Sequence, residues 1–70
     1  MSSVISRETV EAVPRGGTIR YRFKFTFDNG EVHYRRAWVP AETNEADKRQ
    51  ECETLMLEQL AEVEARRMVR

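Results

Sequence analysis

The chain has few of the residues from which catalytic and metal-binding sites are usually built. Its 70 residues include one cysteine, Cys52, and one histidine, His33. A structural zinc site takes about four Cys or His ligands, and an internal disulfide needs a second cysteine, so we expect neither. Cys52 and His33 form the only pair of nucleophile and base, and we expect the predicted sheet to separate them. We therefore predict no enzymatic activity, no metal site and no cofactor.

Long apolar runs are also absent. No run approaches the roughly 18 apolar residues of a membrane span. The polar N-terminus lacks the apolar segment of a signal peptide. A lone cysteine is typical of a reducing compartment, so we expect a cytoplasmic protein without a membrane partner. A length of 70 residues predicts one small domain, 1–70.

The formal net charge is zero, yet the charge is unevenly distributed. Residues 1–40 contain seven Lys/Arg and four Asp/Glu, a net +3, whereas residues 41–70 contain five and eight, a net −3. Such a chain can attract a second copy or present a basic surface to an anionic partner. Domains that act on nucleic acid usually have a clear net positive charge, so the overall balance favours a protein partner.

Residues 19–38 alternate between apolar and polar side chains, which is the period of a half-buried strand. Asn29-Gly30 lies between the two alternating runs and predicts a hairpin with a two-residue type I′ turn. With that turn, the residue numbers of cross-strand partners add to 59. One face of the hairpin is then almost wholly apolar, with Tyr21, Phe23, Phe25 and Phe27 opposite Trp38, Arg36, Tyr34 and Val32.

Arg36 is the one cation on this predicted apolar face. A buried guanidinium must stack on aromatic rings, extend to an edge, or pair with a carboxylate of the helix. A bulge at Arg35-Arg36 is a further solution, because it would rotate one arginine outward. In the same register, Ala37 and Val39 belong to the opposite face and are apolar positions available for self-association.

Residues 4–13 predict a first strand, which Pro14-Arg15-Gly16-Gly17 joins to the second. Two registers stay open, since a shift by one residue turns every side chain over. The preferred register puts Val4, Val10 and Ala12 on the apolar face. The other register puts Ile5, Thr9 and Val13 there.

A helix is predicted after Pro40, because residues 45–67 contain neither proline nor glycine. Asn44 or Thr43 is a suitable N-cap, with acids in the first turn and arginines in the last turn to complement the helix dipole. One stripe of the helix is apolar: Cys52, Met56, Leu60 and Val63. The predicted fold class is α+β, a three-stranded antiparallel β-meander (strands at about 4–13, 18–28 and 31–39) packed against one C-terminal α-helix (about 45–67).

The polar face of the predicted hairpin is the candidate binding site. Its residues are Arg20, Arg22, Lys24, His33 and Arg35. Long cationic side chains also keep an open sheet soluble without any partner, so a merely solvated face is the alternative. A three-stranded sheet can, however, enter a major groove, read base edges and hold phosphates.

The order of elements resembles a known family. Over residues 18–64, a meander with an Asn-Gly hairpin is followed by a helix rich in Glu and Ala. This arrangement resembles the arm-site-binding domain of tyrosine recombinases and the related plant domains that bind the GCC box. The resemblance implies DNA binding by the basic face of the sheet.

The sequence thus leads to two functional hypotheses. The first is a non-enzymatic protein-interaction or assembly module that associates with itself. It is favoured by the small core, because burial of about a dozen large apolar side chains only about offsets the ordering entropy of the chain. The alternative is a DNA-binding accessory domain that uses the basic face.

Overall fold

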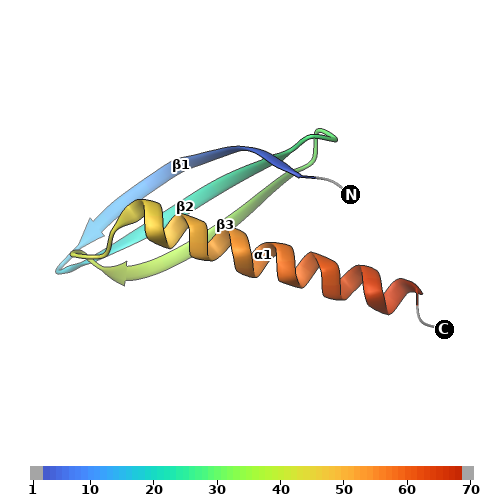
Figure 1. Ribbon diagram of the computed structural model, residues 1–70. Coiled ribbons are helices and arrows are strands. Elements are labelled where there is room, and N and C mark those ends of the chain that lie inside the picture. Colours follow the sequence, from blue (N-terminus) through green and yellow to red (C-terminus); the bar gives the residue numbers. More distant parts are fainter. Residues whose placement is uncertain (1–2, 69–70) are drawn as a thin grey trace.

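The computed structural model describes residues 3–68, which form one antiparallel sheet and one helix (Figure 1). The strands are β1 (Val4–Arg15), β2 (Thr18–Phe27) and β3 (Val32–Pro40), in the sheet order β1-β2-β3. The helix is α1 (Glu45–Met68). The predicted β-β-β-α arrangement of the α+β class is confirmed, with element ends within two residues of the predicted ones.

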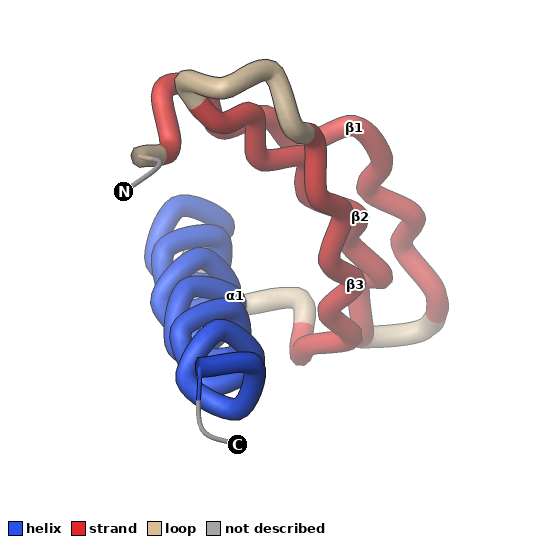
Figure 2. The backbone as a smooth tube through the Cα atoms, turned by 90° about the vertical axis from the view of Figure 1, so that its right-hand side faces the viewer, coloured by secondary structure: helices blue, strands red, loops and turns tan. Residues whose placement is uncertain are grey.

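The sheet has one covered face and one open face. Figure 2 shows the sheet curving around one side of α1, so that the helix lies on its concave side. We call the face turned toward α1 the inner face and the opposite one the outer face. Within residues 3–68, no helix is both long and apolar enough to span a membrane.

The first hairpin contains a two-residue turn at Gly16-Gly17. Both glycines have positive φ, 42° and 74°, as a type I′ turn requires, and Arg15 pairs directly with Thr18. Further along, the register shifts between Thr9 and Glu11 and again between Val4 and Ser6. Because of these irregularities, neither of the two registers considered for β1 holds along the whole strand.

Parts of both registers of β1 are therefore present. Val4 pairs with Phe27 and Ala12 pairs with Tyr21, as in the preferred register. Val10 lies in an irregularity outside the paired positions and is 43% exposed, which contradicts that register. Between Val4 and Ala12, the inner positions of β1 are occupied by two polar residues, Thr9 opposite Phe23 and Arg7 opposite Phe25.

The second hairpin has a three-residue loop where a two-residue turn was predicted. The Gly30 N–H donates to the Phe27 carbonyl (3.0 Å), and the Phe27 N–H donates to the Glu31 carbonyl (2.8 Å). Gly30 has a φ of +89°, and among the described residues only glycines have positive φ, so Asn29 does not adopt the type I′ conformation. A turn followed by a glycine in the left-handed region is the usual three-residue hairpin loop.

Because of this loop, the β2–β3 register differs by one residue from the predicted one. Partner numbers add to 58, so Tyr21 pairs with Ala37 and Phe23 with Arg35. The prediction was therefore wrong for every residue of β3, since a shift of one exchanges the two faces. Four residues predicted on the apolar face belong to the outer face: Val32, Tyr34, Arg36 and Trp38. The β2–β3 pairing runs without a bulge, so the bulge considered at Arg35-Arg36 is not present.

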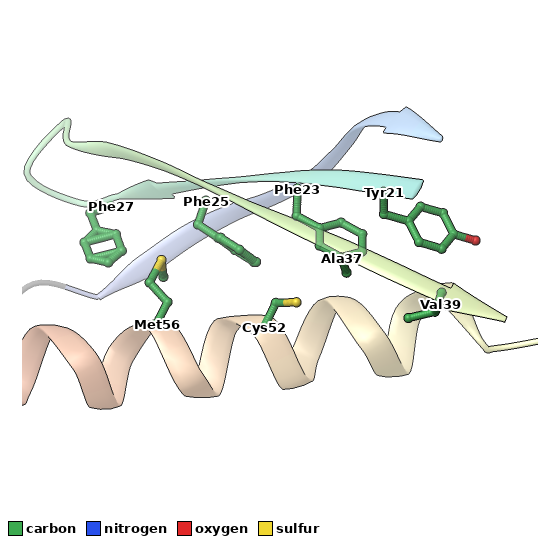
Figure 3. Close-up of a cluster of buried hydrophobic side chains, with 8 residues drawn as sticks. All are labelled: Tyr21, Phe23, Phe25, Phe27, Ala37, Val39, Cys52 and Met56. Atoms are coloured by element: carbon green, nitrogen blue, oxygen red, sulfur yellow. The ribbon is translucent and has the colours of Figure 1, made fainter. Parts of the chain in front are cut away.

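The core lies between the inner face and α1 (Figure 3). It consists of eight buried residues: Tyr21, Phe23, Phe25, Phe27, Ala37, Val39, Cys52 and Met56. The aromatic rings all come from β2, whereas β3 contributes the small side chains of Ala37 and Val39, which the sequence had placed outside. The small side chains leave room for the helix, so that Met56 is completely buried beneath the rings.

The helix begins and is oriented as predicted. The Asn44 side-chain oxygen accepts a hydrogen bond from the Asp47 N–H (3.0 Å), which confirms Asn44 as the N-cap. Of the predicted stripe, Cys52 and Met56 are buried and Leu60 is partly buried. Val63 is 44% exposed, so its predicted place in the core was wrong.

Strand β1 is held to the helix by polar contacts. The Arg7 guanidinium donates to both carboxylate oxygens of Glu53, one of them at 3.1 Å, and the carboxylate raises the pKa of Arg7. The Thr9 hydroxyl donates to Glu45 (2.8 Å) and accepts from Arg49 (3.0 Å). These charge-assisted contacts lie between β1 and α1, where an apolar strand would supply core side chains.

We predict that Glu53→Gln lowers the free energy of unfolding by about 1 kcal/mol, because it removes the charge of a bidentate pair whose carboxylate is mostly shielded from water. Glu51→Gln is the matched control. It removes the charge from a pair with Lys48 whose carboxylate is 58% exposed, and is expected to cost only a few tenths of a kcal/mol. Urea denaturation of both variants measures the difference, and equal effects would show that the β1 contact contributes nothing.

We also predict that Gly30→Ala lowers the free energy of unfolding by about 1–2 kcal/mol. The space around Gly30 is open, so the expected loss comes from forcing a Cβ into the left-handed region. Glu42→Ala, at an exposed position between β3 and α1, should change stability by less than about 0.5 kcal/mol. Chemical denaturation compares the two, and a Gly30 variant as stable as the Glu42 variant would contradict the prediction.

Candidate nucleic-acid interface

The outer face carries cations and aromatic rings in neighbouring cross-strand positions. Opposite pairs are Arg20 with Trp38, Arg22 with Arg36, and Lys24 with Tyr34. Within residues 3–68 no element packs against this face, because α1 lies on the other side of the sheet (Figure 2). We call the set Arg20, Arg22, Lys24, Tyr34, Arg36 and Trp38 the outer-face cluster.

The structure places three of the five predicted site residues together. Arg20, Arg22 and Lys24 lie on the outer face, as predicted. His33 and Arg35 do not, because they pair with Phe25 and Phe23 and therefore belong to the inner face. This correction has the same cause as the others, the one-residue difference in the β2–β3 register.

Both inner-face residues are accommodated at the edge of the core. The His33 ring lies 5.1 Å from the Phe27 ring, and its Nε2 is 3.5 Å from a Glu31 carboxylate oxygen. Arg35 donates to the Tyr34 carbonyl (2.7 Å) and, at 3.5 Å, to the Gln59 side chain on α1. Arg35 is thus the cation that β3 places on the apolar side, where Arg36 was expected, and it extends to the helix edge.

The centre of the outer-face cluster carries more cations than acids. Arg22 lies directly opposite Arg36, and like charges in that position repel. Two acids of β1 lie on the same face: Glu8 is opposite Lys24, and Glu11 is opposite Arg22, with its carboxylate 3.3 Å from Arg20. A hollow of about 250 Å³ opens here, lined by Glu11, Arg20, Arg22 and Arg36 together with Tyr21. An anion in this hollow would relieve the repulsion between the arginines.

Two large aromatic side chains border the cations on β3. Trp38 is 65% exposed and Tyr34 is 44% exposed. The guanidinium carbon of Arg22 lies 4.6 Å from the centre of the Tyr34 ring, a cation–π contact. The Trp38 indole N–H donates to the Thr18 hydroxyl (2.8 Å), which fixes the orientation of the ring. The two rings are therefore available to a ligand on the open face.

The structure also shows where Cys52 and His33, the only cysteine and the only histidine of the sequence, lie relative to the sheet. Cys52 and His33 both lie on the inner side, so the predicted separation by the sheet was wrong. No hydrogen bond joins them, and burial raises the pKa of the Cys52 thiol, which disfavours the nucleophilic thiolate. Among the described residues, no group of three or more His, Cys, Asp or Glu side chains could hold a metal ion.

No protein-family model, curated protein or solved structure matches the chain. The resemblance to arm-site-binding domains therefore rests on the order of the elements alone.

Sequence reasoning missed Tyr34, Arg36 and Trp38 as members of the site. The signal was present in Asp28-Asn29-Gly30, because these residues suit a three-residue loop as well as Asn29-Gly30 suits a two-residue turn. A second signal was Ala37-x-Val39, two small apolar residues that fit beneath an approaching helix better than Trp38 does.

We predict that Arg36→Glu stabilises the fold. The substitution replaces a like-charge cross-strand pair with an opposite-charge pair, and such pairs contribute about 0.2–1 kcal/mol. Arg36→Gln, which removes the charge without reversing it, should give a smaller gain. Thermal or urea denaturation at low salt measures both, and a loss of stability in the two variants would contradict the assigned pairing of Arg22 with Arg36.

Proposed function

We propose that the protein binds duplex DNA through the outer-face cluster. The observation that carries the proposal is the directly opposed pair Arg22 and Arg36, which with Arg20 surrounds a hollow on the open face of the sheet. Arg22 is also opposite Glu11 on β1, whereas Arg36 lies on the edge strand β3 and, within residues 3–68, has only Arg22 opposite it. A ligand that supplies negative charge, such as a DNA phosphate, would reduce the repulsion between the two arginines.

The shape of the sheet supports the same ligand. Three strands spaced by about 4.8 Å are roughly 10 Å wide. The major groove of DNA is about 12 Å wide and accepts strands as well as helices. The outer face is the convex side of the curved sheet (Figure 2), so it can enter a groove while its cations reach the phosphates on either side.

The corrected register changes which hypothesis the cluster favours. The sequence placed Trp38, Tyr34 and Arg36 in the core, and the net charge then favoured a protein partner. With these three residues outside, the open face carries four cations and two aromatic rings in adjoining positions, beside two acids of β1, Glu8 and Glu11. Interleaved cations and aromatic rings suit a nucleic acid, since the rings can pack on sugars or bases while the cations contact phosphates.

The proposal is tested by titrating a labelled duplex oligonucleotide at low salt, with fluorescence anisotropy and the emission of Trp38 as readouts. Trp38 is the only tryptophan of the chain, so its emission reports on the cluster directly. We expect binding whose logarithmic salt slope is roughly −3 to −4, as four phosphate contacts would give. An unchanged anisotropy and an unchanged Trp38 emission at low salt would overturn the proposal.

Two variants localise the binding. Arg36→Gln removes one positive charge from the cluster and should weaken binding by about tenfold or more. Gln50→Glu changes the net charge by the same amount on an exposed position of α1, away from the outer face, and should leave the affinity nearly unchanged. Equal effects of the two would mean that any binding depends on net charge and not on the outer-face cluster.

A further inference from the structure

The loop between β2 and β3 contains the dipeptide Asn29-Gly30, in which an asparagine side chain can react with the backbone. Both residues are exposed. Gly30 has no side chain to shield its peptide nitrogen. No atom beyond its chain neighbours lies within 4 Å of the position that a Cβ would occupy there. The Gly30 nitrogen is therefore accessible to the side chain of Asn29.

A hydrogen bond folds the Asn29 side chain back along the loop. The Glu31 N–H donates to the Asn29 side-chain oxygen (2.9 Å), which is the arrangement of an Asx-turn. A side chain that bonds to the N–H two residues on passes the intervening peptide nitrogen, which is that of Gly30. The donor also polarises the side-chain carbonyl, because it points at the oxygen on which negative charge develops when a nucleophile adds to Cγ.

Another hydrogen bond of the loop opposes such an attack. The Gly30 N–H donates to the Phe27 carbonyl (3.0 Å), so this bond must open before the nitrogen can lose its proton. Opening one exposed hydrogen bond slows a reaction by about fivefold to tenfold. The Glu31 N–H assists the attack by a similar factor, so the two contacts offset each other and the site stays reactive in the folded chain.

We propose that Asn29 is a site of spontaneous deamidation in the folded protein. The Gly30 nitrogen loses its proton to hydroxide and forms a bond to Cγ of Asn29. The bond from Cγ to Nδ2 breaks, and ammonia leaves with a proton taken from water. Water then opens the resulting succinimide ring at either carbonyl, which gives aspartate or isoaspartate. Hydroxide and water are the only co-reactants, and the inference does not rest on DNA binding.

The modification changes the loop that sets the β2–β3 register. The succinimide nitrogen carries no hydrogen, so the bond from Gly30 to the Phe27 carbonyl is lost. Isoaspartate restores the N–H but lengthens the main chain of the loop by a methylene group. Both products add a carboxylate between Asp28 and Glu31. We therefore expect the modified chains to be more acidic, and the isoaspartate form to unfold at lower urea concentration.

The test is incubation of the full chain at neutral and mildly alkaline pH, followed by mass spectrometry of the proteolytic peptide that contains residue 29. We expect Asn29 to convert faster as the pH rises, and in the folded chain at a rate within about tenfold of that in urea. Asn44 is the internal control. Its side chain also accepts a backbone N–H (3.0 Å), but the next residue, Glu45, has a side chain and begins α1. The proposal would be overturned by an Asn29 that reacts no faster than Asn44, or about a hundredfold more slowly in the folded chain than in urea.

Two variants test the part played by the Glu31 N–H. Glu31→Pro removes this donor, whereas Glu31→Ala removes the same side chain and keeps the N–H. We expect the proline variant to deamidate about fivefold more slowly than the alanine variant in buffer, and at the same rate in urea. Circular dichroism checks that both variants are folded. Equal rates in the folded variants would overturn the role assigned to the Glu31 N–H, and the wild-type comparison of buffer with urea holds without them.

Discussion

The positive φ of Gly30 is the constraint on which the rest of the structure depends. It allows a three-residue loop between β2 and β3, and this loop sets which residue of β3 lies opposite each residue of β2. The register then decides which side of β3 faces the helix. A loop one residue shorter would bury Trp38 and expose Ala37, so a single backbone conformation determines both the core and the outer face.

The composition of the core follows from this register. Because β2 supplies four aromatic side chains and β3 supplies Ala37 and Val39, the inner face is bulky along one strand and shallow along the next. The helix packs into the shallow part and covers the rings with Met56 (Figure 3). Strand β1 has no large apolar side chain between Val4 and Ala12 on this face, and Arg7 and Thr9 bind the helix through polar contacts instead.

The sequence was sufficient to predict the elements, because strong local signals mark each of them. The alternation of residues 19–27, the N-cap Asn44 and the helix without glycine or proline all act within a few residues. The β2–β3 register could not be predicted from the sequence, because Asp28-Asn29-Gly30 suits two loops of different length. Either register puts one arginine on the apolar side, Arg35 or Arg36, so the hydrophobic pattern did not separate them. The irregularities of β1 likewise arise from pairing with β2 and leave no mark in the sequence of β1.

The net charge of the chain is also a poor guide to the charge of the candidate site. A net charge of zero weighs against DNA binding only if a phosphate senses the whole chain, whereas at 0.1 M salt the Debye length is about 10 Å. A helix packed on a sheet lies roughly 10 Å from it, and the acids on the solvent side of α1 are further away still. A phosphate placed at Arg22 and Arg36 would therefore respond chiefly to the cations around it and to the β1 acids Glu8 and Glu11. The acids of α1 lie across the sheet from the outer face, so the overall neutrality of the chain and the excess of cations around Arg22 and Arg36 are compatible.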